Sequence, residues 1–364
     1  MATPRLFRLK AEVAPASSGP QALVLPIARV RVDTGVFHLD QLYDYFVPER
    51  LSEDLQIGVR VQVPFGNRET EGIVVERVSR PLITGEIKKI SKVISRNQVA
   101  TSHSLQIYDE VARIYGCNPW DIIRSAIPPR VASVDKEIYV SESATSRIGK
   151  ASSVFFTFAP YSSPESQIAV QAKEYLKFGS VLIVAPDEND VDNIVTNLEK
   201  IGIHALKLTA ALSREERYLN YLKSVKGAVK VVVGTRSSIF LPLKDLATIM
   251  IFKESSFDHY EVRSPGWNSR TVAETRARLE NLNLILSGYS PSSDVALQID
   301  SKKIKYINAR TDVSVAAFTP VSGTLLPGRI FADIRIALKS GPVLFLAPRK
   351  GYGNALMCSH CKNI

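Results

Sequence analysis

Between residue 153 and the end of the chain, short apolar runs alternate with stretches of helical spacing. The runs lie at 181–185, 231–233, 248–251, 284–286 and 343–346. The helical stretches lie at 165–177, 189–200, 213–224, 271–282 and 329–339. Unbroken apolar runs of this length are typical of parallel strands that are buried on both faces. The alternation therefore predicts an α/β domain whose parallel sheet is covered by helices on both sides.

The N-terminal part follows a different pattern, in which apolar and polar residues alternate. Between Ile27 and Ser95, short segments of this kind are separated by Gly and Pro, and residues 64–67 have the composition of a turn. This pattern predicts a small β-barrel or sandwich. Residues 102–130 change to helical spacing, and a second short helix is expected at 119–126, with Pro in its first turn. The two helices fit a winged-helix-like module.

Charge and cysteine content narrow the class of protein. The chain has 364 residues with 46 Lys and Arg against 36 Asp and Glu, and residues 301–364 alone carry ten basic and two acidic residues. A basic end fits a polyanionic partner such as nucleic acid, and it also fits a merely solvated face. No run approaches the ~18–20 apolar residues of a membrane span. Three cysteines are too few for a secreted disulfide scaffold, so we expect a cytoplasmic protein without a membrane partner.

Several short segments together carry a resemblance to a known family. The N-terminal segments are Tyr43-Asp44-Tyr45 with Pro48, GVRVQVPFG at 58–66 and GIV at 72–74. Further along the chain are DIIRSAIPP at 121–129, GTRS at 234–237 and RKGYGNALMCSHC at 349–361. In order and spacing these segments resemble the bacterial PriA family of primosomal replication-restart helicases. The shared order over residues 27–361 makes the resemblance specific, although no single segment is decisive.

The resemblance implies that the N-terminal domain binds the 3′ end of a nascent strand at a stalled fork. The family's pocket uses an aromatic residue, an Asp, a Gly and a Lys, which by position are Tyr43, Asp44, Gly66 and Lys88. An aromatic ring can stack on a base, a carboxylate can accept a hydrogen bond from a 3′-hydroxyl, and a Lys can neutralise a phosphate. From the residues alone another interpretation stays open, with Tyr43 in the core and Asp44 and Gly66 serving turns.

The family is an ATP-driven superfamily-two helicase, but this chain lacks both motifs of the motor. In place of the phosphate loop G-x-x-x-x-G-K-[ST], residues 158–165 read FAPYSSPE. After Ser163, Pro164 stands in the position of the Lys and Glu165 in the position of the Ser or Thr. The acidic D-E-x-H motif is replaced by FKES, with Phe252 and Lys253 in the acidic positions. A Pro has no backbone N–H to donate to a phosphate, and the negative charge of a Glu repels one. Without the two acidic side chains, Mg²⁺ has no carboxylate ligands. We therefore expect a retained helicase fold without a motor, which puts ATP and Mg²⁺ as cofactors in doubt.

This departure resembles a motor-less branch of the family in high-GC Gram-positive bacteria. The residues Gly234, Thr235, Arg236 and Ser237 resemble a motif through which the family contacts the backbone of single-stranded DNA. Such contacts give affinity without sequence preference. A simple turn after a buried strand is the alternative interpretation of this segment.

The cysteine pair Cys358 and Cys361 has the C-x-x-C spacing of a zinc knuckle. Because Zn²⁺ takes four ligands, the pair supplies half a site, and a redox pair or two ordinary thiols stay open. The resemblance implies the first half of the family's zinc module, so zinc is expected with an incomplete site. Members of the family continue for several hundred residues more. The sequence leaves open whether the chain is a fragment, a frameshifted product or a naturally shortened gene.

The domain organisation combines the pattern with the resemblance. We expect a disordered extension at 1–26, the 3′-end-binding β domain at 27–100, the winged-helix-like module at 101–140 and a linker at 141–152. A degenerate superfamily-two (RecA-like) α/β lobe is expected at 153–310, followed at 311–364 by the start of a second lobe and the incomplete zinc region. The fold class is thus a multidomain α/β protein.

The functional hypothesis is a primosome protein that recognises stalled or forked DNA and promotes primosome assembly without helicase activity. The resemblance implies forked and single-stranded DNA as partners, with other primosome proteins, single-strand-binding protein and the machinery that loads the replicative helicase. One alternative is an active ATP-dependent 3′-to-5′ DNA helicase of the same family. Another is an α/β nucleotide- or metabolite-binding enzyme that has no role on DNA.

Overall fold

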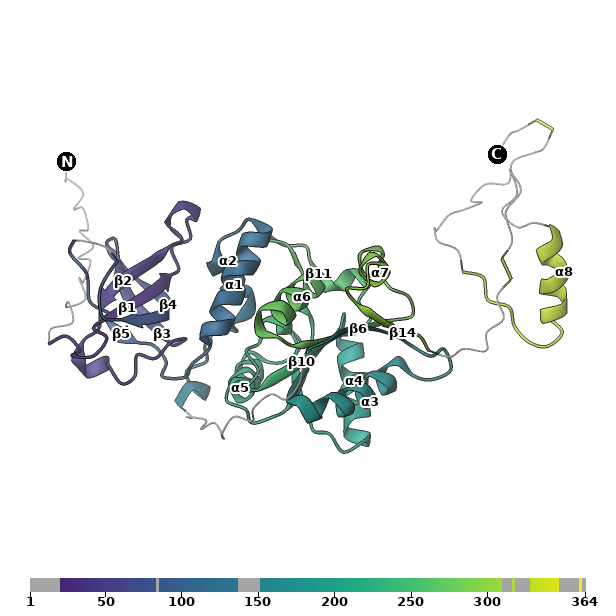
Figure 1. The fold of residues 1–364 in the computed structure, drawn as a ribbon, viewed down its shortest axis with the longest axis horizontal. Coiled ribbons are helices and arrows are strands. Elements are labelled where there is room, and N and C mark those ends of the chain that lie inside the picture. Colours follow the sequence, from purple (N-terminus) through teal and green to yellow (C-terminus); the bar gives the residue numbers. More distant parts are fainter. Residues whose placement is uncertain are drawn as a thin grey trace, which may run out of the picture. The chain divides into compact units, whose positions relative to one another are not determined.

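The computed structural model describes residues 20–82, 85–136, 151–309, 316–317, 328–346 and 360–361 (Figure 1). Most of the expected N-terminal extension, residues 141–150 of the expected linker, and Cys358 lie outside these ranges. By its contacts the chain divides into two units, Met1–Thr311 and Asp312–Ile364. Within the described ranges, no helix is long and apolar enough to span a bilayer.

The β domain is a five-stranded antiparallel sheet in the order β2-β1-β4-β3-β5. Its strands are β1 (Ile27–Val32), β2 (Leu42–Phe46), β3 (Arg60–Phe65), β4 (Arg68–Val78) and β5 (Lys92–Val93). The segment before β5 joins the two outer edges. Phe46 N donates to Lys88 O (2.9 Å) and Ile90 N to Phe46 O (3.0 Å), while Ser91 N donates to Gln62 O of β3 (3.0 Å). The sheet therefore closes around its apolar residues, so that of the two predicted forms, a small barrel or a sandwich, the domain adopts the barrel.

The two predicted helices follow, α1 (Ser102–Tyr115) and α2 (Pro119–Ala126). Helix α1 begins with a capping box, because Thr101 Oγ1 accepts from Ser104 N and Ser104 Oγ accepts from Thr101 N. Helix α2 begins with Pro119, which has no N–H to leave unsatisfied. The described residues between 101 and 136 contain no strand, so a wing is not seen there and the winged-helix description stays a prediction.

The α/β domain has a parallel sheet whose described strands have the order β14-β6-β13-β10-β7-β9-β8. These strands are β6 (Ser153–Thr157), β7 (Ser180–Val184), β8 (Leu206–Leu208), β9 (Val231–Gly234), β10 (Leu246–Ile251), β13 (Asn283–Gly288) and β14 (Lys305–Ile307). The helices are α3 (Pro164–Tyr175), α4 (Glu188–Lys200), α5 (Arg214–Val225), α6 (Ser269–Glu280) and α7 (Ser293–Asp300). Helices α3 and α4 cover one face, and α6 and α7 cover the other, as Figure 1 shows.

Shorter elements complete the described structure. A two-stranded ribbon pairs β11 (Tyr260–Glu261) with β12 (Trp267–Asn268). The 3-10 helices are η1 (Phe37–Leu39), η2 (Glu49–Leu51), η3 (Val134–Lys136), η4 (Leu176–Phe178), η5 (Arg236–Phe240) and η6 (Phe257–His259). Helix α8 (Gly328–Ala337) belongs to the second unit and confirms the helix expected at 329–339.

One predicted strand is wrong, and several elements were not predicted individually. Residues 342–346 form no strand, and the side chains of Leu344 and Leu346 are 81% and 89% exposed. A strand needs a neighbour for its backbone hydrogen bonds, and no described segment pairs with this one. The unpredicted strands β8 and β14 have three residues each at the sheet edges, and α7 buries only Val295, so their sequence patterns are weak.

Helix α1 lies between the barrel and the α/β domain and shares a core with both. Tyr108 of α1 is fully buried, and its hydroxyl donates to Phe240 O (3.2 Å). Tyr221 of α5 donates to Val99 O (2.6 Å), directly before α1. Ile73 of β4 belongs to the same apolar cluster. These contacts explain why the barrel, the helix pair and the parallel sheet lie in one unit. The predicted domain boundaries inside this unit stay predictions.

Asp135 of η3 is a polar junction in the same region. Its Oδ1 accepts from Ser95 Oγ (2.7 Å), Tyr218 OH (2.9 Å) and Asn97 Nδ2 (3.2 Å), while Oδ2 pairs with Arg130 Nε (2.7 Å). Burial alone would raise the pKa of Asp135, but these hydrogen bonds outweigh it and hold the pKa below its usual range. The ionised form therefore links the end of the barrel segment to α5.

We predict that Asp135→Asn lowers the free energy of unfolding by about 1–3 kcal/mol at neutral pH, because buried donors lose a charged acceptor. A carboxyl with a depressed folded pKa stabilises the fold above its unfolded pKa and loses this effect as the pH falls through the folded value. Denaturant unfolding between pH 3 and 7 should show a smaller deficit of the variant at acidic pH. Asp192→Asn, at a 62% exposed side chain, is the control. A deficit that does not change with pH would contradict the role of the Asp135 charge.

Candidate nucleic-acid interface

Three of the four residues expected at the 3′-end site lie at one end of the barrel. The ring of Tyr43 in β2 contacts Phe65 edge-on, with centroids 5.0 Å apart, and its hydroxyl donates to Leu39 O (2.7 Å). Gly66 closes the turn between β3 and β4 with a φ of +59°, a conformation that favours glycine. Lys88 Nζ donates to Gly66 O (3.1 Å). The structure thus brings Tyr43, Gly66 and Lys88 together around Phe65.

An open hollow of about 320 Å³ lies at the same end. It is lined by Thr34, Val36, Leu39, Phe65, Gly66, Asn67 and Arg68. The neighbouring Phe37 side chain of η1 is 69% exposed. An aromatic and apolar hollow with basic groups at its side can accept a base and its phosphate. Phe65, Arg68 and Phe37 were not predicted as site residues, because the sequence does not show which loops meet at the barrel end.

Asp44 lies apart from these three residues. Successive residues of a strand point to opposite faces, so Asp44 faces away from Tyr43. Its buried carboxylate accepts a hydrogen bond from Leu82 N (2.6 Å) and lies 3.5 Å from Arg29 Nε of β1. The structure therefore does not bring Asp44 together with the other three, and its carboxylate already has partners.

The GTRS segment lies at the carboxyl end of β9. A Cβ on Gly234 would lie 2.5 Å from Leu208 O and 2.6 Å from Ser238 Cβ, so only glycine fits there. Thr235 precedes η5, and its carbonyl accepts from Ser238 Oγ (2.7 Å). Arg236 Nε pairs with Glu261 (3.0 Å) of β11, while Ser237 is exposed. The expected backbone-contacting residues thus form one tight turn at the sheet edge.

The segment in the position of the phosphate loop is occupied by the protein's own side chains. Ser163 caps α3, whose first residue is Pro164. The amide of Gln167 binds the loop from the helix side, since its Oε1 accepts from Ala159 N (2.9 Å) and its Nε2 donates to Ala159 O and Ser162 O (both 3.1 Å). The Gln167 side chain thus occupies one backbone donor and two backbone acceptors of this loop.

Lys253 and Phe252, which stand in the position of the acidic motif, also have their contacts within the protein. Lys253 Nζ pairs with Asp190 (2.7 Å) of α4 and lies 4.0 Å from Glu165 of α3. Phe252 is fully buried, with its ring centroid 5.3 Å from that of Phe158. Burial raises the pKa of Asp190, and although the hydrogen bond from Lys253 opposes this, the pKa stays above its usual range. The positions that would hold Mg²⁺ and phosphate thus contribute to an ion-pair cluster and to the core.

The cysteine pair is only partly described. Cys361 is an exposed free thiol, and Cys358 lies outside the described residues. Among the residues that the structure describes, no three His, Cys, Asp or Glu side chains are grouped so that they could hold a metal. Zinc binding by Cys358 and Cys361 stays a prediction. The third cysteine, Cys117, is half-buried, and burial raises the pKa of its thiol to about 11.

Comparison with known proteins adds to this geometry. Residues 29–128, which include most of the barrel and the helix pair, match the family described as the 3′ DNA-binding domain of PriA. Proteins named probable replication restart protein PriA from Mycobacterium tuberculosis (strain H37Rv) and Mycobacterium leprae are 30% and 28% identical over 90% of this chain. The chain covers 56% and 57% of those relatives, a little over half of their length. Saccharomyces cerevisiae Dbp5 bound to RNA and ADP BeF3 is a solved structure with 11% identity and a TM-score of 0.35, covering 44% of this chain and 42% of that one.

The family match and the similarity along nine tenths of the chain agree with each other. Along 90% of its length this chain is similar to proteins named replication restart protein PriA, and it spans a little over half of their length.

We predict that Lys253→Met lowers stability at neutral pH by about 1–2 kcal/mol. This is less than the about 3–5 kcal/mol of a fully buried pair, because Lys253 is 36% exposed. The variant leaves the Asp190 carboxylate without its cation. A carboxyl with a raised folded pKa destabilises the fold increasingly as the pH rises above its unfolded pKa. The deficit of the variant should therefore grow from pH 4 to pH 7.

The double variant Lys253→Met/Asp190→Asn should recover most of the loss in denaturant unfolding. Lys207→Met is the matched control, because Lys207 pairs with the exposed Asp192. Equal losses for the two single Lys variants at pH 7 would refute a special role of the Lys253 cluster.

Proposed function

We propose that this chain acts in replication restart by binding forked DNA, with the 3′ end of a strand held at the end of the barrel. The gathering of Tyr43, Gly66 and Lys88 at one end of a domain that matches the 3′ DNA-binding family carries this proposal. The relatives are named replication restart proteins, which supports the same process.

The chemistry of the barrel end suits a terminal nucleotide. The rings of Tyr43 and Phe65 and the exposed Phe37 offer apolar surface for a base. Lys88 is exposed and held over the Gly66 turn, where its ammonium can neutralise a phosphate. Asp44 retains acceptor capacity, because each carboxylate oxygen has two lone pairs, but it would reach a 3′-hydroxyl only from the outer face of β2.

We also propose that the chain binds DNA without ATP-driven unwinding. The support is the pairing of Lys253 with Asp190 and Glu165 and the capture of the 158–163 segment by Gln167. An active 3′-to-5′ helicase of the same family is the alternative. It would need an acidic pair for Mg²⁺ in the place of buried Phe252 and ion-paired Lys253.

The remaining parts of the proposal follow from the family. We propose that the GTRS turn contacts the backbone of single-stranded DNA, for which Arg236 would exchange its pairing with Glu261 for a phosphate. Other primosome proteins, single-strand-binding protein and the loading machinery of the replicative helicase are the proposed protein partners. Cys358 and Cys361 have thiolate donors suited to zinc and would supply half of a tetrahedral site.

We predict that the protein binds a fork with a free 3′-hydroxyl arm about tenfold more tightly than one ending in a 3′-phosphate, as expected for one hydrogen bond to a charged group (about 1.5 kcal/mol). Fluorescence anisotropy with both forks measures the difference. Lys88→Ala should weaken binding and reduce the slope of log K against log salt by about 0.7–0.9. Lys200→Ala, an exposed lysine of α4, is the matched control. Equal affinity for both forks would contradict 3′-end recognition.

We predict no ATP hydrolysis above background in the presence of single-stranded or forked DNA, because no described group replaces the missing phosphate-binding Lys and acidic pair. A coupled ATPase assay with an active superfamily-two helicase as positive control measures this. Addition of ATP should also leave the fork affinity unchanged. A DNA-stimulated turnover that survives repeated purification would favour the helicase alternative.

A further inference from the structure

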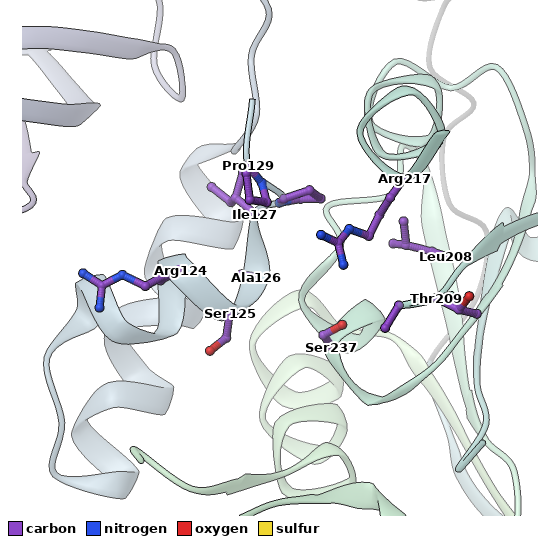
Figure 2. A pocket seen from close by; sticks show the side chains of 11 residues that line it. Arg124, Ser125, Ala126, Ile127, Pro129, Leu208, Thr209, Arg217 and Ser237 are labelled. Carbon is purple, nitrogen blue, oxygen red and sulfur yellow. The ribbon is translucent and has the colours of Figure 1, made fainter. Parts of the chain in front are cut away.

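A small cavity lies beside the GTRS turn, between the end of α2 and the parallel sheet (Figure 2). Its volume is about 120 Å³. One wall is the end of α2 and the segment 127–129, and the other is formed by the ends of β8 and η5 together with α5. At about 30 Å³ per water molecule, this space suits a single small group rather than a nucleoside.

The cavity contains a cation without a counter-charge. Figure 2 shows the guanidinium of Arg217 extending from α5 into the space between the 127–129 segment and Ser237. The Nε of Arg217 is buried and has no hydrogen-bond partner in the part of the chain that the structure describes. The residues that line the cavity include no Asp or Glu. Arg217 as a whole is only partly buried, but a partly buried cation that faces a cavity without an acidic side chain favours an anionic occupant.

The second arginine of the cavity wall behaves differently. Arg124 points away from the space in Figure 2 and pairs with Asp33 (3.0 Å) and Asp121 (3.3 Å). Arg124 is therefore neutralised by the protein itself, whereas no ion pair of Arg217 is found among the described residues. The contrast between the two neighbours indicates a specific place for an anion at Arg217 rather than a general basic surface.

The place of the cavity in the fold supports the same conclusion. Leu208 is the last residue of β8 and Thr209 follows it, while Ser237 lies shortly after the end of β9. In parallel α/β sheets, ligands bind beyond the carboxyl ends of the strands. Ser237 is exposed and offers a hydroxyl donor next to the Arg217 guanidinium. An arginine and a hydroxyl form a donor set that phosphate oxygens accept well.

We propose that Arg217 and Ser237 form a binding site for one phosphate group, supplied by the backbone of single-stranded DNA that follows the GTRS turn. This inference rests on the proposed DNA-binding function and adds a contact away from the 3′-end site. Inorganic phosphate has the same chemistry and is the other possible source of the group. The site does not involve the segments at 158–165 and 252–255, whose charges are already paired.

The test uses an oligonucleotide that ends in a 3′-phosphate, so that recognition of a 3′-hydroxyl does not contribute. Arg217→Gln should weaken its binding about fivefold at 0.1 M salt and reduce the salt slope by about 0.7, the value for one phosphate of a single strand. Ser237→Ala should weaken binding less, and Arg217→Lys should keep most of the salt slope. Lys223→Gln removes a positive charge from the same helix as the matched control.

A second arm distinguishes the source of the phosphate. Thermal unfolding of the full chain is measured with inorganic phosphate and with chloride at equal ionic strength. A stabilisation by phosphate that requires Arg217, without any change in oligonucleotide affinity, would assign the site to the free ion and overturn the DNA contact. Unchanged affinity and no phosphate effect in folded Arg217→Gln would overturn the site altogether. If the wild type binds 3′-hydroxyl and 3′-phosphate forks equally well, and Arg217→Gln still weakens oligonucleotide binding, the result counts only against the proposed 3′-end function.

Discussion

The structure of the first unit depends on the burial of helix α1 between two sheets. Tyr108 is fully buried and bonds to Phe240 O, and Tyr221 of α5 bonds back to Val99 O before the helix begins. Fully burying one such side chain contributes about 1.5–3 kcal/mol, and each buried hydroxyl also needs its partner. Because the same apolar cluster contains Ile73 of the barrel, the barrel and the parallel sheet cannot separate without exposing α1. The DNA contacts proposed for the two domains would therefore belong to one body rather than to two independent modules.

At the carboxyl edge of the parallel sheet, charged and polar groups are paired within the protein on one side and lack such partners on the other. Beyond β6 and β10, the protein's own groups satisfy the positions where a nucleotide would bind, through Gln167 and through Lys253 with Asp190. Beyond β8 and β9, the guanidinium of Arg217 has no carboxylate among the residues that line its cavity. Charges that are neutralised internally lose their attraction for a ligand, whereas an unneutralised cation keeps it. Under the proposed function, a cation without a carboxylate in its cavity lies on the side where the DNA backbone would pass, and paired charges lie on the side where ATP would bind.

Much of the fold could be predicted from the sequence, because the core of each element is encoded by local periodicity. The buried strands β7, β9, β10 and β13 and the capped helices follow directly from apolar runs and spacing. The strand predicted from the apolar run at 343–346 is wrong, because the run has the composition of a strand but no described neighbour to pair with. The site was less predictable. Whether Asp44 faces Tyr43, or Lys253 reaches Asp190, depends on strand direction and on residues 63 positions apart. Arg217 gave no sequence signal, because an unpaired charge is recognised only when its surroundings are known.

The replaced motor residues also explain how the sheet remains stable without a ligand. An ATP site needs uncompensated groups, such as a lysine over an open loop and an acidic pair at a strand end, and these cost stability until the ligand binds. Here Phe252 instead adds its ring to the core beside Phe158, and Lys253 neutralises a carboxylate whose burial would otherwise be unfavourable. Gln167 is bonded to the loop backbone at Ala159 and Ser162. Each of these side chains is satisfied by contacts within the protein rather than by a ligand. Restoring a single motif residue would therefore break an existing contact before it created a nucleotide site.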